Sequence, residues 1–344
     1  MISTLKAYSP RTILKILDLG SICHNKRSIN YDSIDAFAAE NRSKNDDNNK
    51  LRESIIGAII NNLIPESYYT HSEKWRKIKS GIYIFIDQLC EKRNITFDTC
   101  VCVQKAGRNN HYDLDLTING IEKVNVEFKY GVDRVNDAPQ FVSPTKPSQF
   151  LNVNFDNWFY ENHLSKIAEY GNLEMPDKDV YLKTINNNVV KCMTQYKEKY
   201  DTNKEFNKFC KKIDKLAIKE FNSFAMLDIE KMSTYLLKTQ SMKDYMCYKN
   251  GSFYHDQINE SLYNITAVVK REPTNFICDT VSGMKLEIKL RFKNGCGLQF
   301  PAFQIKRKIP GVKELRAICG ENDITAPKLK KNICKTLDEN NIIY

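Results

Sequence analysis

The 344-residue sequence predicts an α/β fold in which helices flank a mixed central sheet, with further helical and β elaborations. Apolar residues recur at helical spacing before residue 95, and apolar and polar residues alternate within residues 96–130. After a lysine-dense helical stretch at about 175–248, strand-like segments return toward the end of the chain. With 344 residues, 42% of them hydrophobic, the chain can bury a sizeable core as one large domain or two modest ones, and we expect one elaborated domain over 1–344.

The expected parts are a helical part (1–95), a hairpin core (96–150), a lysine-rich helical part (151–250) and a β-rich part (251–344). In the first part, "NKLRESIIGAIINNLI" and "KWRKIKSGIYIFIDQLCEKRN" each predict a helix. Their expected buried stripes are Leu51, Ile55, Ile56, Ile59 and Ile60, and Ile78, Ile82, Leu89 and either Ile84 or Phe85. In the last part, strands are predicted at "NITAVVKR", "NFICDTV", "MKLEIKLRFK" and "LQFPAFQIKRK".

The formal net charge of +10 favours a polyanionic partner, with nucleic acid ahead of an anionic membrane surface. The amino terminus lacks the uninterrupted apolar core of a signal peptide, and the apolar runs "SIIGAII" and "GIYIFI" are much shorter than a membrane span. We therefore expect a soluble, intracellular protein of the cytoplasm with no membrane partner. The eleven cysteines include no CxxC pair, which argues against a zinc finger or ribbon.

The segment "HYDLDLTINGIEKVNVEFKYG", residues 111–131, predicts two strands joined by an Asn-Gly turn. Side chains alternate between the two faces of each strand. The polar faces carry Asp113, Asp115, Glu127 and Lys129. The question is whether the two polar faces coincide.

The register of this hairpin decides whether its two polar faces lie on the same side. A two-residue turn would mix polar and apolar faces, whereas a loop of Asn119 to Ile121 pairs Ile118 with Glu122 and sets Asp113 opposite Glu127. Because a one-residue slip flips every side chain, burial of the apolar face favours the second register. Carboxylates that face each other destabilise a strand pair. A bound divalent cation such as Mg²⁺ would neutralise their charge, so we expect a metal site here.

An aspartate, a short hairpin and then Glu-x-Lys resembles the PD-(D/E)xK nuclease superfamily, which includes most type II restriction endonucleases. The matching residues are Asp113, Glu127 and Lys129, while Tyr112 stands where the motif usually has proline. The segment "LRFKNGCGLQFPAFQIKRK" also resembles late strands of restriction-type enzymes, so the resemblance extends over most of the chain. It implies a restriction-endonuclease-like sheet, with residues 96–150 as the catalytic hairpin core.

By this resemblance, the reaction is metal-dependent hydrolysis of phosphodiester bonds in DNA. Asp113, Glu127 and the backbone carbonyl of Phe128 would bind Mg²⁺, for which Mn²⁺ would substitute. Lys129 would position or help to deprotonate the attacking water. Asp115 is the alternative to Asp113, and Glu53 of the preceding helix would either add an acid near the metal or lie on the helix surface.

A second Glu-x-Lys, Glu287 and Lys289, follows Asp279. It ranks below the first copy, because "TVSGM" after Asp279 forms no clean hairpin face.

The resemblance predicts a site-specific, type II restriction-like endonuclease that acts on double-stranded DNA. It also implies a homodimer and a cognate DNA methyltransferase as partners. The alternatives are a structure-directed nuclease of repair or replication, a non-catalytic DNA-binding protein with the same fold, and a lysine-rich scaffold. Base recognition requires side chains with donors and acceptors in the major groove, supported by phosphate contacts. The candidates for base contacts are Asn136, Gln140, Lys146 and Gln149 in one stretch and Arg291, Asn294, Gln299 and Gln304 in another. Lys306, Arg307 and Lys308 are expected to contact phosphates.

Overall fold

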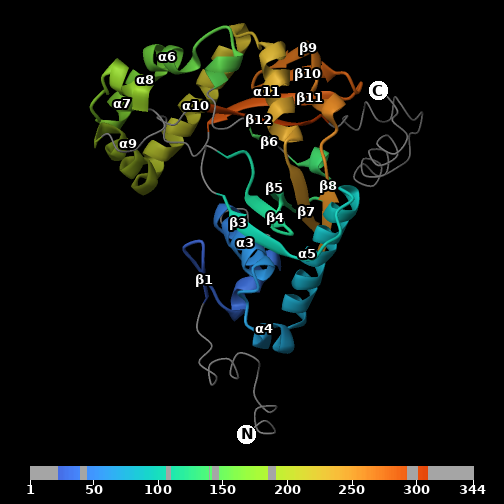
Figure 1. The fold of residues 1–344 in the computed structure, drawn as a ribbon. Coiled ribbons are helices and arrows are strands. Elements are labelled where there is room, and N and C mark those ends of the chain that lie inside the picture. Colours follow the sequence, from blue (N-terminus) through green and yellow to red (C-terminus); the bar gives the residue numbers. More distant parts are fainter. Residues whose placement is uncertain are drawn as a thin grey trace, which may run out of the picture. The chain divides into compact units, whose positions relative to one another are not determined.

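The computed structural model describes residues 22–38, 45–105, 110–138, 140–141, 147–184, 191–292 and 301–308. The chain divides into two compact units, which are drawn together in Figure 1. The first unit is Met1–Ala138 with Thr239–Ile258, and the second is Pro139–Lys238 with Asn259–Tyr344. The first unit is therefore built from two separate segments of the chain, and both contribute strands to its sheet.

The first unit contains a five-stranded mixed sheet flanked by helices, in agreement with the expected α/β class. Its strands, in spatial order, are β3 (Cys100–Gln104), β4 (Leu114–Ile118), β5 (Glu122–Tyr130), β7 (Asp244–Lys249) and β8 (Ser252–Asp256). Only β5 and β7 pair in parallel, and the other neighbours are antiparallel. A segment from late in the chain thus completes a sheet that the early hairpin begins.

The helices of the first unit bury the predicted apolar stripes. The other elements of this unit are β1 (Ile22–His24), β2 (Arg27–Ile29), η1 (Tyr31–Ala38), α3 (Asn45–Ile60), α4 (Glu66–His71), α5 (Glu73–Lys92) and η3 (Val135–Asp137). Helix α3 packs against β3, and α5 packs against β8 (Figure 1). Ser72 caps α5 by accepting a hydrogen bond from the backbone N–H of Trp75. In α5, Phe85 is buried and Ile84 is 48% exposed, which decides the alternative left open by the spacing.

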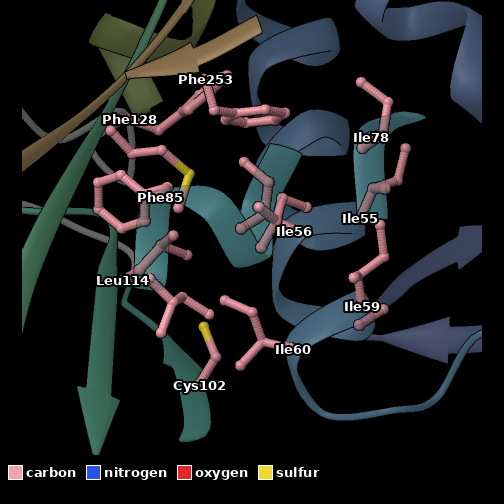
Figure 2. Packing of buried hydrophobic residues seen from close by; sticks show 14 of the residues in the cluster. Ile55, Ile56, Ile59, Ile60, Ile78, Phe85, Cys102, Leu114, Phe128 and Phe253 are labelled. Carbon is pink, nitrogen blue, oxygen red and sulfur yellow. The ribbon is translucent and has the colours of Figure 1, made fainter. Parts of the chain in front are cut away.

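The core of this unit lies between the helices and one face of the sheet (Figure 2). Isoleucines of α3 meet Phe85 of α5 and the inward-facing residues of β4, β5 and β8, such as Leu114, Phe128 and Phe253. The alternation in β4 and β5 is strict, with apolar residues buried and their neighbours partly or fully exposed. Burial therefore occupies one face of the hairpin and leaves the other for polar side chains.

The β4–β5 hairpin has the predicted register, with Ile118 across from Glu122. Asn119 and Gly120 both have positive φ, 52° and 71°, as a tight hairpin turn requires. The Asn119 side chain accepts hydrogen bonds from the backbone N–H groups of Asp98 and Thr99, each at 3.0 Å. This asparagine both forms the turn and ties it to the segment that leads into β3.

The helical pattern expected to continue to about residue 248 ends at Ser241, and β7 follows instead. Strands β7 and β8 are joined by Asn250 and Gly251, which have φ values of 52° and 87°. The same Asn-Gly turn chemistry that builds the first hairpin therefore builds a second one. The lysine-rich sequence before it hid this signal.

The second unit combines a helical layer with a five-stranded antiparallel sheet. Its sheet, in spatial order, is β6 (Gln140–Phe141), β12 (Pro301–Arg307), β11 (Lys285–Phe292), β10 (Asn275–Thr280) and β9 (Ile265–Glu272). Its helical segments are η4 (Pro147–Phe150), α6 (Phe155–Phe159), η5 (Tyr160–Leu164), α7 (Ser165–Gly171), α8 (Lys178–Thr184), α9 (Lys191–Thr202), α10 (Lys204–Phe224), α11 (Ile229–Ser241) and α12 (Glu260–Tyr263), and the last residues of α11 fall in the first unit. The four strands predicted in the last part of the chain are confirmed as β9 to β12. Across the described ranges, no helix combines the length and apolar character needed to cross a bilayer.

We predict that Asn119→Ala lowers the free energy of unfolding of the first unit by about 2 kcal/mol, because alanine disfavours positive φ and cannot replace the side-chain hydrogen bonds. Urea denaturation of the full chain measures this change. Asn119→Gly keeps the turn geometry and should lose less stability. Ile121→Thr, at a side chain that is 86% exposed, should change stability by less than about 0.5 kcal/mol, and an equal loss in this control would contradict the assignment.

Candidate active site

The polar face of the β4–β5 hairpin carries the predicted acids. Leu114 lies across from Val126, so extending this register by one residue places Asp113 across from Glu127. The backbone N–H of Asp113 donates to the carbonyl of Val126 at 3.0 Å, and the backbone N–H of Phe128 donates to Asp113 Oδ2 at 2.9 Å. The backbone of β5 thus fixes the position of the Asp113 carboxylate.

Glu127 is held by two ammonium groups. Lys129 Nζ donates to Glu127 Oε1, and Lys243 Nζ donates to Glu127 Oε2 and to the backbone carbonyl of His111. The side chains of Lys129 and Glu127 are 15% and 16% exposed, whereas that of Lys243 is 3% exposed. Asp113, Glu127, Lys129 and Lys243 are called the acid–lysine cluster below.

Lys243 is the member of this cluster that the sequence analysis missed. It directly precedes β7, and Val126 pairs with Asp244, so the residue before Asp244 falls on the same sheet face as Glu127. The available signal was the Asn250-Gly251 dipeptide between two short apolar runs, which predicts the β7–β8 hairpin. The parallel pairing of β7 with β5 is not encoded locally, so no spacing rule could have joined Lys243 to Glu127.

The two carboxyl groups have opposite pKa shifts. Burial raises the pKa of Asp113 to about 6, and the nearby charge of Glu127 adds to this effect against the opposing influence of the lysines and the Phe128 N–H. Burial also acts to raise the pKa of Glu127, but Lys129 and Lys243 outweigh it and lower that pKa to about 2. At neutral pH Glu127 is therefore firmly ionised, while Asp113 exchanges a proton in the mildly acidic range. Such a divergence between paired carboxyl groups is common at functional sites.

The two additional acids considered from the sequence have other partners. Asp115 Oδ2 lies 3.5 Å from Lys105 Nζ, while its buried Oδ1 has no hydrogen-bond partner. Glu53 accepts a hydrogen bond from Gln104 Nε2 at 3.1 Å. Within the described residues, no group of three or more His, Cys, Asp or Glu side chains is gathered as a metal-ligand set.

The donor set of the acid–lysine cluster nevertheless fits a hard divalent cation. Mg²⁺ is commonly held by one or two carboxylates, with water completing its coordination. Asp113 and Glu127 supply that pair. Asp115 stays the alternative to Asp113, because its buried Oδ1 has no hydrogen-bond partner. Because each oxygen of Glu127 already accepts a hydrogen bond from a lysine, a cation that binds there competes with two ammonium groups.

The second Glu-x-Lys does not form an equivalent arrangement. Glu287 lies across from Ile277 on β10 and accepts a hydrogen bond from Asn275 Nδ2 at 3.0 Å. Asp279 pairs instead with Lys285, and their charged groups are 3.1 Å apart. No acid lies across from Glu287 on β10, unlike the arrangement in the first copy.

The residues considered for DNA recognition are dispersed. On one face of β11 and β12, Arg291 donates to Gln304 Oε1 at 3.2 Å, and Lys306 is 49% exposed near Glu287. Arg307 is 8% exposed and lies on the opposite face of β12, so this burial does not support the expected phosphate contact. Of the others, Asn136 is partly buried in η3, Gln149 is exposed in η4, and Gln140 lies in β6. Lys308 Nζ lies 3.8 Å from Glu272 Oε1. Lys146, Asn294 and Gln299 lie outside the described residues.

We predict that Asp113→Asn stabilises the first unit at pH 7.5 by on the order of 2 kcal/mol. The folded pKa lies above the unfolded value of 3.8, so wild-type stability attributable to Asp113 is full below about pH 4 and is lost as the pH rises through about 6. Asparagine still accepts the Phe128 N–H but does not ionise. Urea denaturation at pH 4 and pH 7.5 should show the variant's advantage at the higher pH, and the same difference at both pH values would contradict the shift.

Glu127→Gln should have the opposite effect, with a loss on the order of 3 kcal/mol at pH 7.5, because it leaves the buried Lys243 without its counter-ion. The folded pKa of Glu127 lies below the unfolded value of 4.5, so this contribution is present above that value and lost as the pH falls toward 2. The double variant Glu127→Gln with Lys243→Met removes the uncompensated charge and should recover part of the loss. A double variant less stable than the single one would contradict the pairing.

Taken together, the acid–lysine cluster combines two carboxylates, a group type that suits a hard cation, with ammonium groups, a type that suits an anion such as a phosphate. Asp113, Glu127 and Lys129 come together as expected, while Lys243 is an addition. No protein-family model, no curated protein and no solved structure matches the chain.

Proposed function

We propose that the chain is a Mg²⁺-dependent, site-specific endonuclease that hydrolyses phosphodiester bonds in double-stranded DNA, with a core like that of type II restriction enzymes. The observation that carries this proposal is the hairpin register, which sets Asp113 across from Glu127 with Lys129 on the same face. This order of acid, hairpin, acid and lysine resembles the arrangement in the PD-(D/E)xK nucleases. The excess of lysine and arginine over acids, +10 in formal charge, supports a polyanionic substrate.

Asp113 and Glu127 would hold the divalent cation, with the Phe128 carbonyl as a further ligand and Asp115 as the alternative to Asp113. When bound, the cation would neutralise charge on the scissile phosphate and lower the pKa of a coordinated water. Mn²⁺ would substitute for Mg²⁺, because both accept oxygen ligands. The remaining chemistry belongs to the side chains of the cluster.

Lys129 would act directly on the reacting groups. Its side chain is 15% exposed, against 3% for Lys243, and its ammonium bonds to Glu127, where it would orient the attacking water or neutralise charge that builds on the phosphate. The water oxygen then bonds to phosphorus as the bond to the leaving sugar oxygen breaks.

DNA contacts would come from the polar face of β11 and β12, where Arg291, Gln304 and Lys306 lie together. Asn136 and Gln149 are further candidates for base contacts. Palindromic recognition would require a homodimer, and protection of host DNA would require a cognate methyltransferase. Both partners follow from the family resemblance.

A non-catalytic DNA-binding protein is the second candidate, and a specific contact favours it. Lys243 already neutralises Glu127, so this carboxylate has a counter-ion without a metal ion. A protein that had lost metal-dependent cleavage would tolerate such a contact. This candidate predicts salt-dependent DNA binding without cleavage.

The deciding experiment is digestion of unmodified plasmid and phage DNA with Mg²⁺, with Mn²⁺ and with EDTA. We expect discrete fragments with either metal and none with EDTA. Glu127→Ala and Lys129→Ala should each lower the cleavage rate at least a hundredfold, because each removes a group that acts on the phosphate or its metal.

Lys289→Ala is the matched control, since it removes the lysine of the other Glu-x-Lys and should leave the rate within a factor of two. Loss of cleavage in Lys289→Ala but not in Lys129→Ala would move the site to the second unit. Progressive degradation from ends would indicate a repair-type nuclease instead. Binding without cleavage of any DNA by the wild-type protein would favour the non-catalytic candidate.

A further inference from the structure

Lys243 is an unusual partner for a metal-binding glutamate because its ammonium is almost completely buried, with 3% of the side chain exposed. Burial of a cation is costly unless it is paired and hydrogen-bonded. Both conditions are met here, since Nζ donates to Glu127 Oε2 and to the His111 carbonyl. The ammonium therefore has a built site that joins β5, β7 and the segment before β4.

The charges of the acid–lysine cluster cancel in this state. When all four groups are ionised, the two acids are balanced by Lys129 and Lys243, so the cluster attracts a further cation only weakly. Lys129 already bonds to Glu127 Oε1, which leaves that carboxylate without an uncommitted oxygen. A divalent cation that takes Glu127 as a ligand therefore exchanges with a lysine or shares the carboxylate with it, and both ammonium groups repel that cation.

Lys243 is the lysine that controls this exchange. It lies just before β7, away from the strand of Glu127, and its second bond to the His111 carbonyl can keep the ammonium in place after it releases Oε2. Lys129 shares the strand of Glu127 and is more exposed, so it can turn toward solvent or substrate. Buried charge near the carboxylate, more than exposed charge, determines how strongly a cation is repelled.

We propose that Lys243 is an internal cation that competes with the divalent metal for Glu127 and thereby sets the metal affinity of the site. This inference rests on the proposed function only in that Asp113 and Glu127 are the metal-binding pair. In the metal-free protein Lys243 holds Glu127 in place through its bond to Oε2. In the metal-bound protein it stays beside the site as a positive charge that favours binding of the phosphate.

The test is the affinity of the metal-free full chain for Mn²⁺, measured by isothermal titration calorimetry at pH 7.5. Lys243→Gln and Lys243→Met remove the charge, and each should bind Mn²⁺ at least tenfold more tightly than the wild-type protein. Lys243→Arg keeps the charge and can hold Glu127 with two hydrogen bonds, so its affinity should equal or fall below that of the wild type. Lys249→Gln, at the exposed end of the same strand, is the matched control and should bind as the wild type does.

The direction of the change separates this role from a structural one, because damage to the site weakens metal binding whereas removal of a competitor strengthens it. Circular dichroism establishes that each variant is folded, and if the uncharged variants do not fold, tighter binding by Lys243→Arg overturns the proposal. Wild-type binding that is lost in Glu127→Ala but is not strengthened in Lys243→Gln overturns the competition alone and leaves the nuclease proposal standing. Failure of every folded variant, the wild type included, to bind Mn²⁺ overturns both.

Discussion

Burial of one face of the β4–β5 hairpin is the constraint on which the site depends. Leu114 and Val126 pair across the strands with their side chains in the core, and they fix the register for every neighbouring residue. A slip of one residue would bring the polar residues inside and separate Asp113 from Glu127. The hydrophobic effect thus aligns two like charges that would repel each other in isolation.

That alignment creates an electrostatic demand that the fold meets with lysines. Lys129 and Lys243 hold Glu127 ionised, whereas burial and the charge of Glu127 raise the pKa of Asp113. The same arrangement therefore contains a stabilising acid and a destabilising one. Paired carboxyl groups with divergent pKa values in one polar cluster are common at functional sites, which is why this cluster is the candidate site.

Much of this architecture follows from local pattern. Helical spacing located α3 and α5, alternation located β4 and β5, and the Asn119-Gly120 turn together with the apolar face was enough to derive the register. Helical spacing alone does not determine whether Ile84 or Phe85 is buried, because both fit the apolar stripe. Packing against the rest of the first unit buries Phe85 and leaves Ile84 exposed. The lysine-rich pattern predicts a helix to about residue 248, but α11 ends at Ser241 and β7 follows. The high density of charged residues obscures the short apolar run of β7.

The sequence by itself determines where apolar and polar residues alternate, where tight turns form and where ionisable side chains occur, because these properties depend on a few neighbouring residues. Which distant segment pairs with an exposed strand edge is a long-range property, and it depends on the packing of the whole first unit. The parallel pairing of β5 with β7 is of this kind, and it brings Lys243 to Glu127 across more than a hundred residues. Asp113, Glu127 and Lys129 could therefore be found in the sequence, whereas the cation that neutralises Glu127 from another strand became visible only once the sheet was assembled.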